Sequence, residues 1–148
     1  MNTTKFKTVS EKKTAKQKIR DIIKKPKEKF LTESQEKYWN VLDESQITIC
    51  FGPSGTGKSF ISIKKALDLI WSEDNKYEKI IIIKPAVQAE ENLGFLPGTI
   101  LEKIEPYIRS SLKLMDKIIG KDSREKLITD GFIEIGSATK VYPTAGPL

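Results

Sequence analysis

Apolar residues recur along the chain with two different periods, and these periods predict the order of its helices and strands. In the stretch LTESQEKYWNVL, Tyr38, Trp39 and Leu42 share one side at helical spacing, and Thr32 can cap the start of that helix. The next segment, QITICF, alternates and is rich in β-branched residues. It therefore predicts a first core strand.

Helix-like and strand-like segments continue to alternate after QITICF. A glycine-rich turn is followed by apolar residues at helical spacing as far as Ile70, and KIIIIK is a short apolar run ended by Pro85. Such a continuous run is typical of a strand that is buried on both faces. Since β-branched strands separated by helices favour parallel pairing, these segments predict an α/β fold.

The second half of the chain repeats this alternation. A helical stretch is expected from about Ile100 to Ile119, interrupted near Pro106, and another from Ser123 to Thr129. FIEI then predicts a third strand. We therefore expect a doubly wound, mainly parallel sheet flanked by helices, of the type found in P-loop NTPases but only partly present.

The N-terminal residues are strongly basic. Of the 148 residues, the first 30 carry eleven Lys or Arg against three acids, which is a net charge of +8 in a chain whose total is +6. Apart from KIRDIIKK, where three isoleucines share a helical face, this stretch has no apolar pattern. We expect a flexible, disordered basic arm over residues 1–30 and an ordered domain over residues 31–148, with the arm as a candidate surface for RNA or other nucleic acid.

Several classes of protein and site are excluded by inspection. No apolar run is long enough to cross a bilayer or to serve as a secretory signal, so a soluble, cytoplasmic protein without a membrane partner is expected. The single Cys50 cannot form an internal disulfide, in agreement with a reducing compartment. Because the chain has no histidine, histidine metal sites and histidine-dependent catalytic triads are excluded.

A phosphate-binding loop lies between the first predicted strand and the helix after it. Gly52, Gly57, Lys58 and Ser59 match the pattern G-x-x-x-x-G-K-[ST]. The glycines let backbone N–H groups turn inward around phosphate oxygens, and the helix points its positive end at them. Lys58 is the predicted catalytic residue, reaching the outer phosphates, and Ser59 the predicted Mg²⁺ ligand. The whole predicted nucleotide site comprises Gln35, Gly52, Pro53, Ser54, Gly55, Thr56, Gly57, Lys58, Ser59 and Phe60.

Gln35 has two interpretations from the residues alone. Its amide offers both a donor and an acceptor, so it can read the N6 and N7 edge of adenine. Equally, it is the fourth residue of T-x-x-Q, where it would complete a capping box with Thr32. The loop after KIIIIK is similarly open, because Lys84, Glu90 and Glu91 could contact a ligand or merely belong to a surface loop.

In these residues and in the segment after KIIIIK, the chain resembles the PhoH-like family of P-loop ATPases, whose core is related to helicases. The resemblance runs from about Gln35 to Ile135 and rests on Gln-x-x-Tyr, on FGPSGTGKS, and above all on KPAVQAEENLGFLPGTILEKIEPYI. Family members typically read close to R-P-A-V-E-A-G-E-x-L-G-F-L-P-G there. Lys84, Gln88 and Glu90 depart from that pattern, where the family has Arg, Glu and Gly, so the family roles of positions 84 and 90 are not carried over.

This resemblance implies ATP as the nucleotide, Mg²⁺ as the metal and a link to RNA or to phosphate starvation. It favours Gln35 as an adenine contact. It also implies assembly into homo-oligomeric rings, in which a neighbouring subunit supplies an arginine, although no residue here identifies one.

One family element has no counterpart in this sequence. After a strand equivalent to FIEI the family continues to an apolar strand ending in D-E-A-Q, the Walker B element, whereas this chain continues GSATKVYPTAGPL. Glu91 and Glu134 are the only carboxylates near predicted carboxyl ends of strands. An RNA-linked ATPase and a nucleotide-binding module or fragment without hydrolysis therefore both remain, with a small-molecule kinase as a weaker alternative because GPSGTGKS is also similar to guanylate kinases.

Overall fold

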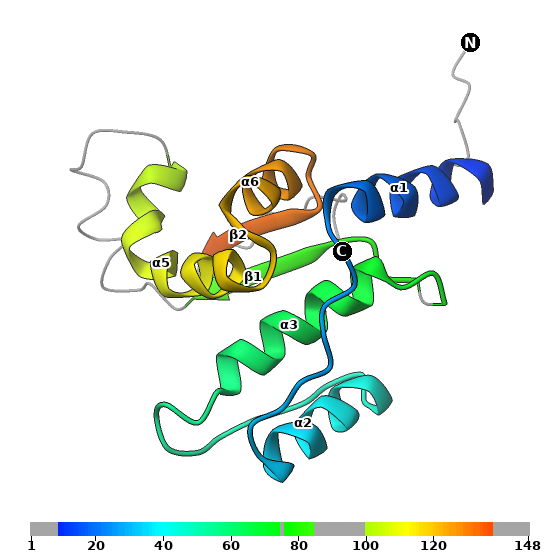
Figure 1. The fold of residues 1–148 in the computed structure, drawn as a ribbon. Coiled ribbons are helices and arrows are strands. Elements are labelled where there is room, and N and C mark those ends of the chain that lie inside the picture. The colour runs from blue at the N-terminus through cyan, green and yellow to red at the C-terminus, as the bar shows by residue number, and fades with distance from the viewer. Residues whose placement is uncertain (1–8, 75, 85–99, 138–148) are drawn as a thin grey trace.

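A computed structural model describes residues 9–74, 76–84 and 100–137, and for residues 9–14 and 100–107 only the secondary structure. The described helices and strands follow one another along the chain as Figure 1 shows. In order they are α1 (Val9–Ile22), α2 (Glu33–Glu44), α3 (Lys58–Trp71), β1 (Ile80–Lys84), α5 (Ile100–Ile119), α6 (Lys121–Thr129) and β2 (Ile133–Ser137).

The two strands form a parallel sheet, as the sequence predicts for KIIIIK and FIEI. Ile80 pairs with Ile133 and Ile82 with Ile135, and the chain crosses from β1 to β2 through α5 and α6. This helical crossover is the connection that parallel strands require. The mixed α/β class is thus confirmed, with a sheet of two strands in the described part of the chain.

The sheet is buried on one face only, so the prediction that KIIIIK is buried on both faces is wrong. Ile80 and Ile133 are 8% and 1% exposed and belong to the core, whereas Ile81 and Ile83 on the other face of β1 are 53% and 44% exposed. The described helices pack on the core side. A doubly wound arrangement, with helices on both faces, is therefore not confirmed.

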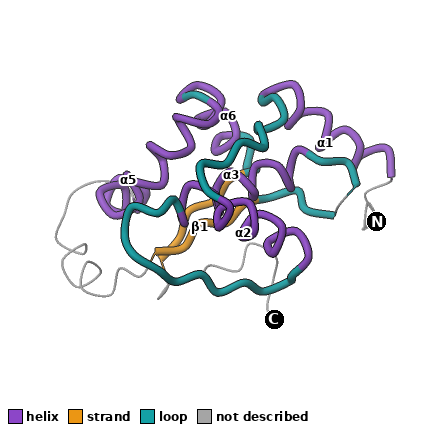
Figure 2. The backbone as a smooth tube through the Cα atoms, turned by 60° about the horizontal axis from the view of Figure 1, so that its bottom comes forward, coloured by secondary structure: helices purple, strands orange, loops and turns teal. Residues whose placement is uncertain are grey.

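The core lies between the buried face of the sheet and helices α1, α3, α5 and α6. Its centre is the apolar face of α3, which contacts α1, α2, α5 and β1. Figure 2 shows α3 in the middle of the molecule with the other helices around it. The buried cluster consists of Ile19, Ile23, Leu67, Ile70, Ile80, Met115, Leu127 and Ile133.

The segment QITICF does not form the first core strand that its pattern predicts. Residues 46–51 are irregular, and Ile47, Ile49 and Phe51 are 84%, 84% and 90% exposed. In Figure 1 this segment runs from the end of α2 back to the start of α3, away from β1 and β2. A segment of alternating apolar and polar residues can pair as a strand. It does so only where a neighbouring strand offers backbone hydrogen bonds. Among the described residues no strand lies beside it.

The basic N-terminal region is also more ordered than expected. Residues 9–22 form α1, and Ile19 and Ile23 are 0% and 4% exposed within the common core. The three isoleucines of KIRDIIKK, which the sequence shows on one helical face, therefore anchor this helix to the domain. The expectation of a disordered arm over residues 1–30 is wrong for α1 and the linker after it.

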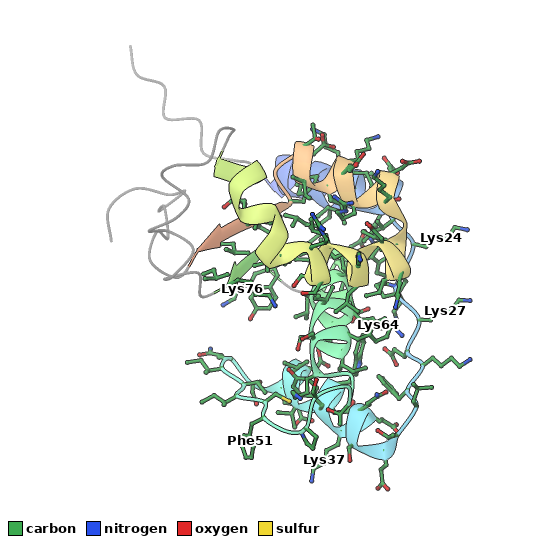
Figure 3. All side chains as sticks on the ribbon, turned by 90° about the vertical axis from the view of Figure 1, so that its left-hand side faces the viewer. Lys24, Lys27, Lys37, Phe51, Lys64 and Lys76 are labelled. Carbon is green, nitrogen blue, oxygen red and sulfur yellow. The ribbon has the colours of Figure 1, made fainter. Side chains whose placement is uncertain are left out.

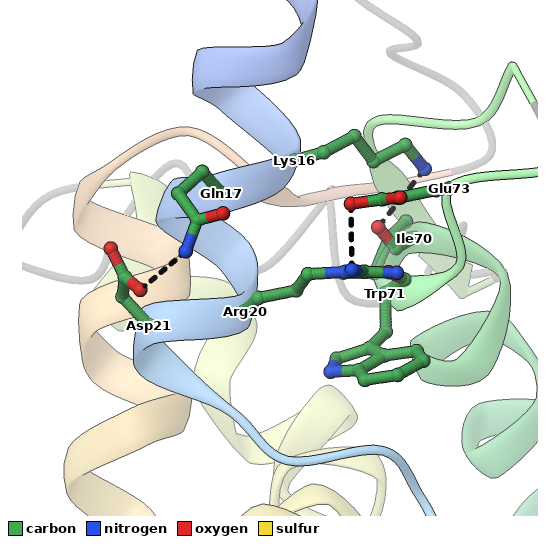
Figure 4. Close-up of polar contacts among 7 residues, drawn as sticks. All are labelled: Lys16, Gln17, Arg20, Asp21, Ile70, Trp71 and Glu73. Carbon is green, nitrogen blue, oxygen red and sulfur yellow. Dashed lines mark hydrogen bonds and ion pairs between the residues drawn. The ribbon is translucent and has the colours of Figure 1, made fainter.

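Charged residues of α1 reinforce this docking by capping the end of α3 (Figure 4). The Lys16 ammonium donates to the carbonyls of Ile70 (3.0 Å) and Tyr77, and Arg20 Nε donates to Trp71 O (3.0 Å). The carbonyls of Ile70 and Trp71 are among those that the end of a helix leaves without intrahelical donors, whereas Tyr77 lies in the segment between α3 and β1. Arg20 also forms an ion pair with Glu73 at 2.6 Å and lies 4.4 Å from the centre of the Trp71 ring.

The predicted helices agree with the structure more closely than the strands do. Thr32 caps α2, its side chain accepting a hydrogen bond from Gln35 N, and Trp39 of α2 is 3% exposed against α3. The interruption expected near Pro106 is wrong, because α5 continues through it. No described helix is both long enough and apolar enough to span a membrane.

Candidate nucleotide-binding site

The loop that matches the phosphate-binding pattern connects the exposed segment 46–51 to the start of α3. A cavity of about 440 Å³ lies against it. Seven of the ten predicted site residues line this cavity together with Leu114 of α5; the seven are Gly52, Ser54, Gly55, Gly57, Lys58, Ser59 and Phe60. The structure therefore places most of the predicted site around one hollow at a helix N-terminus.

Gly57 is required at the junction of the loop and α3. It is the N-cap of the helix, with φ +88°, a conformation that residues with a side chain rarely adopt. A Cβ atom at this position would also lie 2.7 Å from Gln35 Nε2. No side chain caps α3 and its first turn holds no acid, so the free N–H groups and positive end of the helix are left for an anion.

The Lys58 side chain folds back across the loop. Its ammonium donates to Gly52 O at 2.8 Å and to Pro53 O at 2.6 Å. The Thr56 hydroxyl donates to the same Pro53 carbonyl at 2.9 Å, which closes the loop on itself. The loop thus presents one cation beside an uncapped helix start, which is the arrangement that binds phosphate groups.

Gln35 connects α2 to this loop. Its backbone N–H donates to Thr32 Oγ1 (3.2 Å), its Oε1 accepts from Leu31 N (2.9 Å), and its Nε2 donates to Thr56 O (3.1 Å). Half of the predicted capping box is therefore present, because Thr32 caps Gln35 N while the Gln35 side chain accepts from Leu31 N. The contact with Thr56, which neither sequence interpretation contained, shows Gln35 as a brace of the phosphate-binding loop.

A second connection joins α2 to the start of α3. The Ser62 hydroxyl donates to Lys58 O at 2.7 Å, so the Tyr38 hydroxyl is the donor to Ser62 Oγ, also at 2.7 Å. Burial raises the pKa of Tyr38, and the hydrogen bond with Ser62 partly opposes that rise. Tyr38 therefore stays a neutral donor that ties α2 to the loop-bearing turn of α3.

Comparison with known proteins decides the family. The profile of the PhoH-like protein family matches residues 28–141. The chain belongs to the PhoH-like family. It is 36% identical over 118 residues to a PhoH-like protein of Bacillus subtilis and 37% identical over 106 residues to one of Mycobacterium leprae. No solved structure matches the chain.

This PhoH-like chain spans only part of its relatives. The match to the Bacillus subtilis protein covers 78% of this chain and 36% of the relative, and for the Mycobacterium leprae protein the shares are 72% and 30%. Protein PhoH of Escherichia coli, 36% identical over 88 residues, is covered to 24% of its length.

Of the two carboxylates that the sequence places near the carboxyl ends of strands in this PhoH-like chain, Glu134 lies in β2. Glu134 lies opposite Ile81 in the sheet and forms an ion pair with Lys79 at 2.5 Å. Lys84 ends β1, while Glu90 and Glu91 lie outside the described residues. Within the described part of the chain no three His, Cys, Asp or Glu side chains are grouped to hold a metal ion.

Two residues near the loop of this PhoH-like chain were not found by sequence reasoning. Leu114 lines the cavity from α5, and Ser62 carries the hydrogen bond from Tyr38. Leu114 belongs to the apolar face of an amphipathic helix, so nothing in the pattern separates it from core residues. Ser62 follows the motif by three residues, and only its alignment with α2 reveals its role.

Proposed function

We propose that this PhoH-like chain binds ATP with Mg²⁺ through the loop Gly52–Ser59. The observation that carries the proposal is Lys58 beside the uncapped start of α3, where a glycine at the N-cap leaves the first N–H groups exposed. The family, generally one of P-loop ATPases, supports ATP as the nucleotide. Lys58 and the N–H groups of the loop and first helical turn would hold the phosphates.

A magnesium ion fits this site if the protein supplies a single ligand to it. Ser59 is exposed in the first turn of α3 and lines the cavity, so its hydroxyl would be one ligand. Nucleotide phosphates and water would supply the remaining ligands, as Mg²⁺ usually requires in phosphate-binding sites. When bound, the ion would neutralise phosphate charge.

Gln35 is proposed to support the nucleotide site from α2. It holds Thr56 in place and closely approaches Gly57, so it orders the loop before ligand binding. Both polar atoms of the Gln35 amide can form one more hydrogen bond, since Nε2 has two N–H groups and Oε1 has two lone pairs. Adenine recognition by Gln35, implied by the family resemblance, therefore remains part of the proposal.

Hydrolysis is the point that separates the two leading functions. In-line attack on the γ-phosphate needs the metal fixed from two sides and a water held by an acid or amide. Among the described residues Glu134 is committed to Lys79 instead. We expect the isolated chain to hold ATP and to release phosphate far more slowly than about once per second, the low end of ordinary turnover. A kinase is disfavoured because α2 precedes the loop and packs on α3.

The proposed binding partners are based on the same family resemblance and on the positive charge of the N-terminal region. Binding of RNA or another nucleic acid by the basic N-terminal region is proposed, with Lys side chains meeting phosphates. Assembly into a homo-oligomer remains a prediction for which no described residue is assigned a role.

The test of ATP binding is titration calorimetry with Mg-ATP on the whole chain, Lys58→Ala and Lys37→Ala. Lys37 is exposed on α2 and serves as a control for the loss of one positive charge. Removing a charged donor to phosphate should weaken binding by about tenfold or more in Lys58→Ala, with little change in Lys37→Ala. Equal affinity in the three proteins would refute the proposal. Phosphate release by the same proteins, with and without RNA, then separates an ATPase from a binding module.

A further inference from the structure

A second cavity lies beside the phosphate-binding loop, between the linker after α1 and helices α3 and α5. Its volume is about 580 Å³, within the range of pockets that hold ligands. Five lysines line it: Lys24, Lys25 and Lys27 of the linker, Lys64 of α3 and Lys117 of α5. The sequence pattern shows only a basic stretch here, and the fold adds Lys64 and Lys117 to it.

None of these five lysines forms an ion pair with a carboxylate that the structure describes. Other lysines of the domain do, among them Lys65 with Asp43 at 3.0 Å and Lys79 with Glu134 at 2.5 Å. The lining of the cavity also contains no acid. Its positive charge is therefore concentrated, and Glu28 acts on Lys64 from nearby without forming an ion pair with it.

Lys64 is the most enclosed of the five. The residue is 6% exposed, and its ammonium donates to Lys29 O at 3.4 Å and lies 5.6 Å from the centre of the Phe60 ring. Burial lowers the pKa of Lys64, Glu28 raises it and Lys29 lowers it. An ammonium in this setting gains from any anion that enters the cavity, because one long hydrogen bond leaves most of its donor capacity unused.

The floor of the cavity is apolar and reaches the nucleotide site. Ile22, Ile23, Ile118 and Ile119 line it, and Phe60 lines both this cavity and the one against the loop. Figure 3 shows Lys24 and Lys27 extending outward from the linker on the same side of the molecule as Lys64. The lysines thus follow an extended segment above an apolar surface and do not converge on one point.

We propose that this lysine cavity binds a single nucleic acid strand, its phosphates along Lys24, Lys25 and Lys27 and a base against Phe60 and the apolar floor. Strand-binding grooves combine a positive track with apolar or aromatic surfaces for bases, and this cavity has both. A small phosphorylated metabolite would instead call for converging backbone donors, and Pro26 removes one N–H from the linker. The inference rests on the nucleic-acid part of the proposed function, not on ATP binding.

The experiment is fluorescence anisotropy with a labelled oligouridylate of about 16 nucleotides, the upper site size for one strand-binding domain. It compares the whole chain, Lys24→Gln/Lys27→Gln and the charge-matched control Lys37→Gln/Lys76→Gln over a range of salt. Lys37 and Lys76 are exposed, unpaired among the described residues, and lie outside the cavity (Figure 3). If two phosphate contacts are lost, the slope of log affinity against log salt falls by about 1.4 in the cavity variant and much less in the control.

Each outcome decides the proposal. Equal slopes and affinities in the two variants would overturn it, and would assign strand binding to general charge. Absence of oligonucleotide binding by the whole chain would overturn both the cavity and the nucleic-acid part of the proposed function. Titration of the same proteins with Mg-ATP separates these failures from failure of the nucleotide site, because neither Lys24 nor Lys27 lines the loop cavity.

Discussion

Replacement of Gly57 by alanine tests whether the phosphate-binding loop and α2 are built as one unit. The residue has φ +88°, where an L-residue costs about 1–2 kcal/mol relative to glycine. The new Cβ would also lie 2.7 Å from Gln35 Nε2, closer than atoms pack, so the Gln35 amide has to move. Its hydrogen bond to Thr56 O is then lost, at about 1 kcal/mol. We expect Gly57→Ala to lower the free energy of unfolding by about 2–3 kcal/mol.

Gly55→Ala is the matched control for this prediction. Gly55 belongs to the same loop and has φ +80°, but a Cβ at that position meets nothing within 4 Å. It should therefore cost only the backbone strain of about 1–2 kcal/mol. Urea unfolding, followed by tryptophan fluorescence, measures the free energy of unfolding of both variants. An equal dependence of that free energy on urea concentration checks that the two variants unfold in the same way.

A double-mutant cycle separates strain from the contact with Gln35. In the background of Gln35→Ala the obstructing amide is absent, so Gly57→Ala should cost about 1 kcal/mol less than it does in the wild type. Gly55→Ala should cost the same in both backgrounds. Equal costs of Gly57→Ala with and without Gln35, or equal costs of the two glycine substitutions, would refute the view that Gln35 braces the loop.

Two further predictions concern α1 and the lysine cavity. Ile19→Ala should lower the free energy of unfolding by about 2–5 kcal/mol, because Ile19 is 0% exposed in the core; an unchanged urea midpoint would mean that α1 is a dispensable arm. Lys64 has a lowered pKa in the folded protein, so the unfolded chain binds the extra proton, and the stability of wild type relative to Lys64→Met should rise as pH increases toward 10.5. Unfolding curves at successive pH values check this, and a stability difference that is independent of pH, or that falls, would contradict it.

The loop and the helix start that form the candidate nucleotide site could be predicted from the sequence because their geometry is local. Gly52 to Ser59 are consecutive, and the glycine conformations, the lysine and the helix start that make an anion site are all encoded within a few residues. The α2 cap by Thr32 is local for the same reason, and it was predicted. Short-range geometry of this kind depends little on what the rest of the chain does.

Interactions between distant segments were decided only by the tertiary structure. QITICF has the alternating pattern of a strand, but in the structure it is an exposed, irregular segment. KIIIIK does form a strand, and it is buried on one face instead of two. The basic N-terminal stretch becomes a docked helix because Ile19 and Ile23 are buried in the common core, and Lys16 and Arg20 add hydrogen bonds to carbonyls more than fifty residues away. Periodicity reports which side of a segment is apolar but not which partner covers it.

The sequence by itself thus determined the phosphate-binding loop, the helix after it and the family resemblance. The tertiary structure decided that Gln35 supports that loop, that Leu114 lines its cavity, and that Lys64 and Lys117 join the linker lysines around a second cavity. The physical reason is range: backbone conformation and helix-end charge act over a few residues, whereas burial and charge clustering depend on which segments pack together.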